Sequence, residues 1–148
     1  MNKKLSSIDK AYLAGFLDGD GSIYVRAKPN PTYKYGFQIA PYIVFFQSAK
    51  NKRFFDDVFS PLDMGTMRER KDGIMEYSIN RKDSLMAMIR FLKPYLILKK
   101  EQICLLEKIL EEKDKIGSPE DFKNLLGLVE KFKYLNYSKK RKKRTLTP

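Results

Sequence analysis

The sequence contains no histidine, no tryptophan and a single cysteine, Cys104. Without histidine the chain cannot form a Ser-His-Asp triad, a histidine general base or a His-ligated zinc site. One cysteine excludes disulfides within the chain and cysteine-based zinc sites. Because no histidine can activate Cys104, we expect this residue to be a small core residue of a helix, not a nucleophile. Any catalytic metal must then be held by oxygen ligands, which hard cations such as Mg²⁺ or Mn²⁺ prefer.

Long apolar runs are also missing. No stretch reaches the roughly 18 apolar residues that mark a membrane span, and the N-terminus has no signal-peptide core. We therefore expect an intracellular protein without a membrane partner. Positive charge is in excess, with 30 Lys and Arg against 18 Asp and Glu and a net charge of +12. This excess favours nucleic acid as a partner, although a basic soluble protein or a ribosomal-type binder would also carry it.

Hydrophobic periodicity predicts an α+β domain. We expect helices at 8–17, 49–59, 84–92, 99–115 and from 118 to about 136, and strands at 22–28, 37–47, 66–71 and 74–80. The order αββαββα, with C-terminal helices after it, predicts a four-stranded antiparallel sheet with helices packed on one face. Residues 1–137 should form a single domain, and residues 138–148 a basic, flexible tail.

Several details of these elements can be predicted as well. Ser6 and Asp9 have the spacing of a capping box that opens a helix. In the second strand, Pro41 implies an edge position or a bulge. Asp72 and Gly73 favour a tight hairpin turn between the last two strands. Apolar periodicity also predicts which side chains lie together. In the first helix, Ile8, Tyr12 and Phe16 should share one face. The side chains expected to point inward are Phe54, Phe55, Val58 and Phe59 in the second helix and Met75, Tyr77 and Ile79 in the fourth strand.

The first helix runs into a stretch of small residues that ends in two carboxylates, Leu13-Ala-Gly-Phe-Leu-Asp-Gly-Asp-Gly21. We expect the helix to end near Asp18, where glycines follow, and Asp20 to lie just past it with a carboxylate free to bind a cation. On spacing alone, both carboxylates would be solvated capping residues. Ala14 and Gly15 leave a helical face almost without side chains, which suits close approach of another backbone.

This stretch resembles the signature of the LAGLIDADG homing endonucleases, and the rest of the chain up to Asn136 fits their single-motif members. The matching letters are Leu13, Ala14, Gly15, Asp18, Asp20 and Gly21, while Phe16 and Leu17 are hydrophobic replacements and Gly19 stands for an alanine. The resemblance implies a sequence-specific endonuclease that makes metal-dependent double-strand breaks with 3′ overhangs in a long, pseudo-palindromic DNA site.

The resemblance also implies roles for individual residues. Asp20 would bind the catalytic Mg²⁺ or Mn²⁺, with the backbone carbonyl of Gly19 as a further ligand, and no small-molecule cofactor is expected. Gln47 would organise water near the scissile phosphate, and Lys99 would neutralise charge that develops on it. The family carries a basic residue four positions after the glutamine, where this chain has Asn51. Lys50 and Lys52 flank this position, and the sequence does not decide which of them replaces the basic residue.

Charged, amide and aromatic side chains on the outer faces of the strands are of the types that read base edges in the major groove. An ordinary solvated sheet face would be the alternative. The residues expected to contact DNA are Tyr24, Arg26, Lys28, Asn30, Tyr33, Gln38, Tyr42, Arg68, Arg70, Glu76 and Ser78, together with Lys139 and Lys142 in the tail. The tail could instead be a localisation signal.

A chain with one motif supplies one metal-binding carboxylate, so the resemblance implies a homodimer bound to double-stranded DNA. The interface would be formed by Leu13, Ala14, Gly15, Leu17 and Asp18. Alternative functions are an intron maturase that binds RNA, a DNA regulator that does not cleave, and a basic RNA-binding structural protein. An organellar location, in a chloroplast or mitochondrion, is implied by resemblance alone, and the target sequence cannot be read from the chain.

Overall fold

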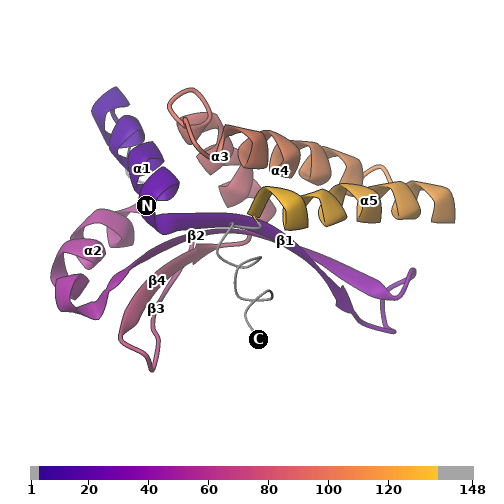
Figure 1. Ribbon diagram of the computed structural model, residues 1–148, viewed down its shortest axis with the longest axis horizontal. Helices are drawn as coiled ribbons and strands as arrows, with labels where there is room; N and C mark the ends of the chain where they lie inside the picture. Colours follow the sequence, from indigo (N-terminus) through magenta and orange to yellow (C-terminus); the bar gives the residue numbers. More distant parts are fainter. Residues whose placement is uncertain (1–3, 137–148) are drawn as a thin grey trace, which may run out of the picture. The chain divides into compact units, whose positions relative to one another are not determined.

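The computed structural model describes residues 4–136 (Figure 1). Its elements follow the predicted order αββαββα with two further helices after it. The helices are α1 (Ser7–Asp20), α2 (Lys52–Phe59), α3 (Lys82–Leu92), α4 (Lys100–Lys113) and α5 (Pro119–Asn136), and the strands are β1 (Gly21–Pro29), β2 (Phe37–Ser48), β3 (Thr66–Glu69) and β4 (Ile74–Ile79). Short 3₁₀ turns, η1 (Ala49–Asn51) and η2 (Ser60–Leu62), flank α2. Within residues 4–136, no helix has the length and apolar character of a membrane span.

The four strands form one antiparallel sheet in the order β1-β2-β4-β3, which confirms the predicted fold class. β2 as a whole lies between β1 and β4, so it is not an edge strand, but the expected edge position of Pro41 holds locally. The register pairs β2 with β4 only from Ile43 to Ser48, so Pro41 falls outside that ladder. The missing N–H of the proline therefore costs no hydrogen bond to β4.

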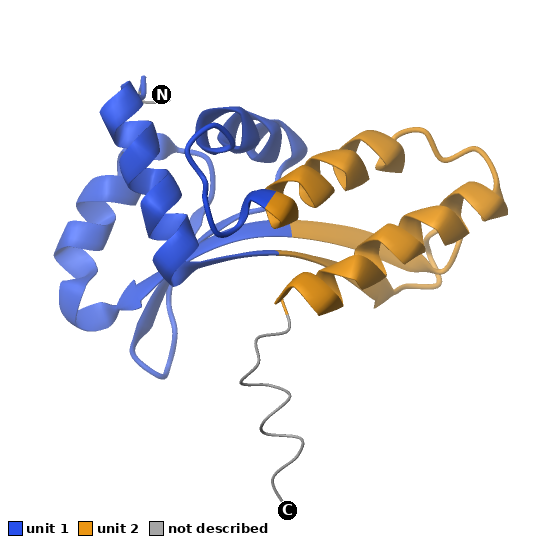
Figure 2. Ribbon diagram, turned by 45° about the horizontal axis from the view of Figure 1, so that its top comes forward, with its two compact units in different colours: residues 1–23, 42–100 blue, residues 24–41, 101–148 orange. Residues whose placement is uncertain are grey.

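The chain divides into two compact units, and β1 and β2 contribute residues to both (Figure 2). Unit 1 consists of Met1–Ile23 and Tyr42–Lys100, and it contains α1, α2, α3, β3 and β4. Unit 2 consists of Tyr24–Pro41 and Glu101–Pro148, and it contains the β1–β2 loop, α4 and α5. That residues 1–137 form a single domain stays a prediction.

In unit 1, α1 begins with the predicted capping box. The Ser6 hydroxyl accepts a hydrogen bond from the Asp9 N–H at 3.0 Å, and the Ser6 N–H donates to the Asp9 carboxylate at 3.0 Å. Further along the helix, the Phe16 ring lies 5.8 Å from that of Phe45 in β2 and 5.3 Å from that of Phe59 in α2, between ring centroids. Aromatic contacts of this kind pack α1 against both elements.

The predicted end of α1 needs correction. The helix continues through Gly19 to Asp20 and does not end near Asp18, because one helical glycine costs only about 1 kcal/mol relative to alanine. Gly21 is the residue at which glycine is required, since a Cβ there would lie 2.9 Å from the Leu17 Cα. The buried face of α1 is formed by Leu13, Ala14 and Leu17, and the face that carries Ile8 and Tyr12 is 82% and 56% exposed at these residues.

Phe54 and Cys104 were expected in the core, and both are exposed. α2 has only eight residues and buries one stripe, formed by Phe55 and Phe59 at a spacing of four. Phe54 lies about 100° around the helix from this stripe. Cys104 follows the buried Ile103 of α4 and is turned away from its core face for the same reason. Val58 is half-buried, whereas Met75, Tyr77 and Ile79 are buried as predicted.

Tyr77 of β4 binds the segment between η2 and β3 through hydrogen bonds. Its buried hydroxyl accepts hydrogen bonds from the N–H groups of Met64 and Gly65, both at 2.8 Å. The preceding Asp63 has a φ of 51°, in the left-handed region, and a Cβ on Gly65 would meet the backbone of Ser78. Burial raises the pKa of the Tyr77 phenol above its ordinary value.

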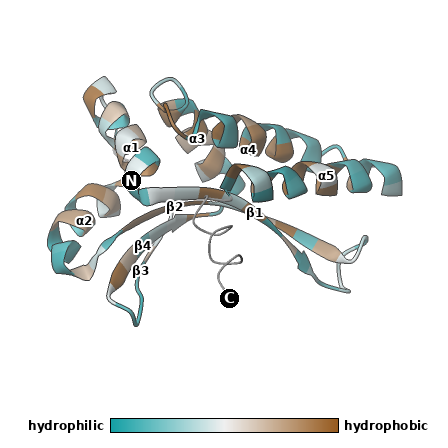
Figure 3. Cartoon of the chain, viewed as in Figure 1, coloured by the Kyte–Doolittle hydropathy of each residue, from teal (hydrophilic) through white to brown (hydrophobic). Residues whose placement is uncertain are grey.

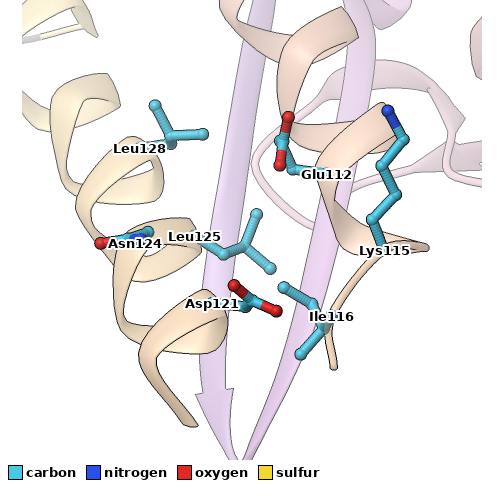
Figure 4. Close-up of a pocket in the computed structure, with 7 residues that line it drawn as sticks. All are labelled: Glu112, Lys115, Ile116, Asp121, Asn124, Leu125 and Leu128. Carbon is cyan, nitrogen blue, oxygen red and sulfur yellow. The ribbon is translucent and has the colours of Figure 1, made fainter. Parts of the chain in front are cut away.

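In unit 2, α4 and α5 lie side by side (Figure 2), and hydrophobic and hydrophilic residues alternate along both (Figure 3). Ser118 caps α5, because its hydroxyl accepts a hydrogen bond from the Asp121 N–H at 3.1 Å. A cavity of about 90 Å³ lies between the end of α4 and the start of α5 (Figure 4). It is too small for a nucleotide, since ligand pockets occupy about 300–1,000 Å³.

Replacing Tyr77 by Phe should lower the free energy of unfolding by about 1–3 kcal/mol, because the buried N–H of Met64 and the part-buried N–H of Gly65 lose their acceptor. Urea unfolding at neutral pH measures the change, and Tyr134→Phe, at a residue that is 82% exposed, is the control. A Tyr77→Phe variant as stable as the control would contradict the role given to this hydroxyl.

The raised pKa of Tyr77 also predicts that the stability contributed by its protonated phenol is lost as the pH rises from about 10 through the higher folded-state pKa. Urea unfolding of the wild type and of Tyr77→Phe across this pH range measures the loss.

Candidate active site and nucleic-acid interface

The carboxylate of Asp18 binds the backbone of the segment that joins α3 to α4. One oxygen, Oδ2, accepts hydrogen bonds from the N–H groups of Ile97 at 2.8 Å and Leu98 at 3.2 Å, and Oδ1 accepts from the N–H of Lys99 at 3.0 Å. Hydrogen bonds to a charged acceptor are about twice as strong as neutral ones. Asp18 therefore fixes the last residues before α4 against the end of α1.

Lys99 completes this contact from the other side. Its ammonium donates to the backbone carbonyl of Asp18 at 3.0 Å. The last four carbonyls of a helix have no partner within the helix and carry its partial negative charge, so a cation is favoured there. The structure thus places the Lys99 ammonium at the end of the helix that carries Asp20. We refer to the four residues Asp18, Ile97, Leu98 and Lys99 as the Asp18 clamp.

Asp20 is the last residue of α1, and its side chain is exposed. Among residues 4–136, no hydrogen bond or ion pair reaches its carboxylate, and no group of three Asp, Glu or Cys side chains could hold a metal ion together. The carbonyl of Gly19 and the carboxylate of Asp20 are suitable oxygen donors for a hard cation. One chain alone offers too few of them, so a complete metal site needs oxygen donors from a second copy or from the substrate.

Gln47 is held at the end of β2 by its neighbours. Its side-chain oxygen accepts from the Ser48 N–H at 2.9 Å and from the side-chain amide of Asn51 at 3.2 Å. These bonds leave the NH₂ group of Gln47 as the donor that can face a substrate, and no hydrogen bond in the described part of the chain connects Gln47 to Asp20 or Lys99. Asn51 thus orients Gln47, which the sequence alone did not indicate.

The two lysines beside Asn51 differ in their partners. Lys52 forms an ion pair with Glu69 at 3.3 Å, and both side chains are about half exposed. Lys50 is exposed on η1 and has no ion pair among residues 4–136. An exposed ion pair is worth about 0–1 kcal/mol, so Lys52 is held only weakly, while the Lys50 ammonium is available to an anion.

The β3–β4 hairpin of unit 1 carries a network of four charges. Arg68 faces Glu76 across the strands, and its Nη2 lies 3.1 Å from the Glu76 Oε1. Arg70 lies 3.5 Å from the same oxygen and 2.6 Å from the Asp72 carboxylate. The predicted grouping of Arg68, Arg70 and Glu76 on one face is therefore correct, and Ser78 lies two residues further along β4. Because both arginine side chains are at least partly exposed, these ion pairs hold the guanidinium groups only weakly.

The residues of unit 2 that were expected to contact DNA lie along β1, the β1–β2 loop and the first part of β2. The Arg26 guanidinium lies 5.2 Å from the centroid of the Tyr24 ring, a cation–π contact. Asn30 uses its side-chain oxygen inside the loop, where it accepts from the Thr32 N–H at 3.0 Å and hydroxyl at 2.7 Å. Lys28, Tyr33 and Gln38 are half-buried or exposed, and Tyr42, which belongs to unit 1, is half-buried. Lys139 and Lys142 lie outside the described residues.

Three of the five residues expected at a dimer interface are already buried within the protomer, namely Leu13, Ala14 and Leu17. Gly15 is exposed, with open space where a Cβ would be. Asp18 is half-buried and belongs to the Asp18 clamp. Any contact between two α1 helices must therefore use the face that carries Gly15 and not the buried face.

Comparison with known proteins gives a consistent result. Residues 13–110 match the model of the LAGLIDADG endonuclease family. The chain is 34% identical over 143 residues to DNA endonuclease I-CreI of Chlamydomonas reinhardtii, and the aligned region covers 96% of this chain and 87% of that protein. It is 31% identical over 131 residues to DNA endonuclease I-CvuI of Chlorella vulgaris, and here the aligned region covers 88% of this chain and 81% of that protein.

The structure agrees with crystal structures of I-CvuI. One of them, in complex with its target and Ca, has a TM-score of 0.82 and 30% sequence identity, and covers 91% of this chain and 86% of that chain. In another, I-CvuI is bound to the I-CreI target in the presence of Mg, with the DNA not cleaved. The chain therefore belongs to the LAGLIDADG endonuclease family.

Replacing Asp18 by Asn should remove charge-assisted hydrogen bonds from the clamp and lower the free energy of unfolding by about 1.5–3 kcal/mol. Urea unfolding measures this loss, and hydrogen exchange of the Leu98 and Lys99 amides should become faster. Glu111→Gln, which removes one negative charge from an exposed site of α4, is the control. Unchanged exchange at these amides in Asp18→Asn would contradict the clamp.

Proposed function

We propose that two copies of this LAGLIDADG endonuclease cut both strands of a long, approximately two-fold symmetric DNA site and leave 3′ overhangs. That the chain is a homing endonuclease follows from its family and its relatives. The finer statement rests on one observation, the Asp18 clamp, which places the Lys99 ammonium on the carbonyl end of the helix that carries Asp20. A two-fold protein requires an approximately two-fold site.

The residues proposed to hold the metal are Asp20 and Gly19, which contribute a carboxylate and a backbone carbonyl. When bound, Mg²⁺ or Mn²⁺ supplies a Lewis acid that polarises the phosphate and activates water. In a dimer, each chain provides one Asp20, so the pair supplies the oxygen donors that one chain lacks. The crystal structures of I-CvuI with DNA in the presence of Ca and of Mg support divalent-metal dependence in general.

Other residues of unit 1 have proposed roles around this site. Lys99 donates to the phosphate where negative charge develops, since its ammonium is already oriented by the Asp18 carbonyl. Gln47, held by Asn51, directs its free NH₂ group to water near the scissile phosphate. Of the two lysines that flank Asn51, Lys50 is the better candidate for the second cation, because Lys52 pairs with Glu69.

The proposed dimer interface extends beyond the small residues of α1. Ile97 and Leu98 are 81% and 73% exposed, although the clamp holds their backbone against the end of α1. Ile8 and Tyr12 are exposed on the same helix. Apolar side chains that border an open glycine position favour contact with a second copy, because burying them removes apolar surface from water. The interface proposed here is therefore Ile8, Tyr12, Gly15, Ile97 and Leu98.

DNA recognition is assigned to the two groups of side chains described above, the charge network of β3–β4 and the basic hairpin of β1–β2. Arginine forks pair with guanine, glutamine with adenine, and glutamate with cytosine. The proposal includes Tyr42 and Ser78 on the sheet and, by charge alone, Lys139 and Lys142. An organellar location also remains a proposal, drawn from the family.

Replacing Asp20 by Asn should abolish cleavage and leave DNA binding nearly unchanged. Even the outer partners of metal ligands typically contribute about 10–100-fold, so the rate of plasmid cleavage with Mg²⁺ should fall at least about 100-fold. Target binding is then measured with Ca²⁺ by a mobility-shift assay. The Glu111→Gln variant serves again as the control. Cleavage by Asp20→Asn at the wild-type rate would disprove the metal assignment, and RNA binding without DNA cleavage by the wild type would favour a maturase.

The two-fold arrangement is tested by a pair of glycine substitutions. Gly15→Arg and Gly127→Arg both place the same side chain at an exposed helical glycine with open space for a Cβ. We expect Gly15→Arg to sediment as a monomer of 17.4 kDa without cleavage activity, and Gly127→Arg to keep the doubled mass of the wild type. A monomeric wild type that cleaves DNA would refute the dimer.

A further inference from the structure

The loop that joins β1 to β2 is braced by its own backbone. The Asn30 N–H donates to the Gly36 carbonyl at 2.8 Å, and the Gly36 N–H donates to the Tyr33 carbonyl at 3.0 Å. Gly36 has a φ of +81°, which L side chains rarely adopt. The Asn30 side chain further holds Thr32. The loop is therefore a compact turn with a shape that does not depend on a ligand.

A single aromatic side chain of α5 contacts both residues that flank Gly36. The Phe122 ring lies 5.0 Å from the Tyr35 ring and 6.3 Å from the Phe37 ring, between centroids, and both pairs are stacked with an interplanar angle of 26°. All three residues are half-buried and belong to unit 2. Figure 2 shows the start of α5 and the β1–β2 loop at the same end of that unit.

Phe122 is itself held firmly, because it lies in the first turn of α5. Its N–H donates to the Ser118 carbonyl at 3.2 Å, and the Asp121 N–H donates to the Ser118 hydroxyl at 3.1 Å. The Asp121 carboxylate accepts from the Gly117 N–H at 3.0 Å. The capped start of α5 is thus a fixed point against which the loop can stack.

The loop also carries cationic and aromatic side chains that could contact DNA. The Lys34 ammonium lies 5.4 Å from the centroid of the Tyr35 ring that stacks on Phe122. Tyr33 is 45% exposed beside it, and Arg26 and Lys28 precede the loop on β1. A displacement of Tyr35 would move Lys34 and Tyr33 as well, because the three residues are consecutive.

We propose that Phe122 is a positioning residue for DNA recognition, which fixes the β1–β2 loop so that its side chains read base pairs of each half-site. Phe122 touches no base itself and acts through Tyr35 and Phe37. This proposal rests on the proposed function. It assigns to the start of α5 a part in sequence specificity that is separate from cleavage.

The test compares Phe122→Leu, which keeps apolar volume but loses the stacked ring, with Phe122→Tyr, which restores the ring. Tyr134→Ala removes an exposed aromatic from the same helix and is the control. The preferred site of the full-length wild type is first selected from randomised duplex DNA. Each variant is then measured for affinity to that site with single substitutions at every position, and for its rate of cleavage when bound.

We expect Phe122→Leu to lose discrimination by about 5- to 150-fold at one contiguous group of positions in each half-site, the range that two aromatic contacts provide. Discrimination at the other positions and the cleavage rate of the bound complex should stay unchanged, and Phe122→Tyr should behave as the wild type. Unchanged discrimination at every position in Phe122→Leu, or an equal loss at every position, would overturn the proposal.

A measurement without DNA tests whether Phe122 holds the β1–β2 loop, independently of DNA recognition. Hydrogen exchange at the Tyr33 and Gly36 amides should be faster in Phe122→Leu and unchanged in Phe122→Tyr and Tyr134→Ala. Equal exchange in all four proteins would disprove the contact's role in holding the loop, whatever the DNA results. If the wild type selects no DNA site while the exchange behaves as expected, the function proposed above fails, and the role of Phe122 in recognition fails with it.

Discussion

The clamp between Asp18 and the segment before α4 is the interaction on which the proposed active site depends. The two carboxylate oxygens of Asp18 accept hydrogen bonds from residues 79 to 81 positions further along the chain, and the Lys99 ammonium donates to the Asp18 carbonyl. The clamp therefore holds a cation at the helix end that also carries the exposed Asp20 carboxylate.

Much of this organisation can be predicted from the sequence, because it is local. The capping box of Ser6 and Asp9, the turn at Gly73 and the buried alternation of Met75, Tyr77 and Ile79 depend on neighbours a few positions away. The order of elements follows from such signals. The motif correctly identified the family, whereas the metal-binding role that it implies for Asp20 stays a prediction.

The predictions that were wrong concern which face of an element meets the core. Phe54 and Cys104 are apolar residues at helical positions, and periodicity alone does not show that a two-turn or one-sided helix leaves them exposed. The part of Asp18 in the clamp was missed for another reason. Its partners are backbone N–H groups, which every residue possesses and which leave no mark on the sequence. The role of Asn51 was missed because its side-chain bond to Gln47 requires the bend of η1.

Glu76 couples the two arginines of the β3–β4 hairpin, and this coupling affects how the hairpin can evolve. Because one carboxylate oxygen serves both Arg68 and Arg70, a substitution at either arginine changes the electrostatic surroundings of the other. Effects of mutations at sites that share a partner are not additive. Adaptation of this surface to an altered recognition sequence would therefore proceed through correlated replacements, and single-residue libraries would underestimate the range of sequences that the scaffold can accommodate.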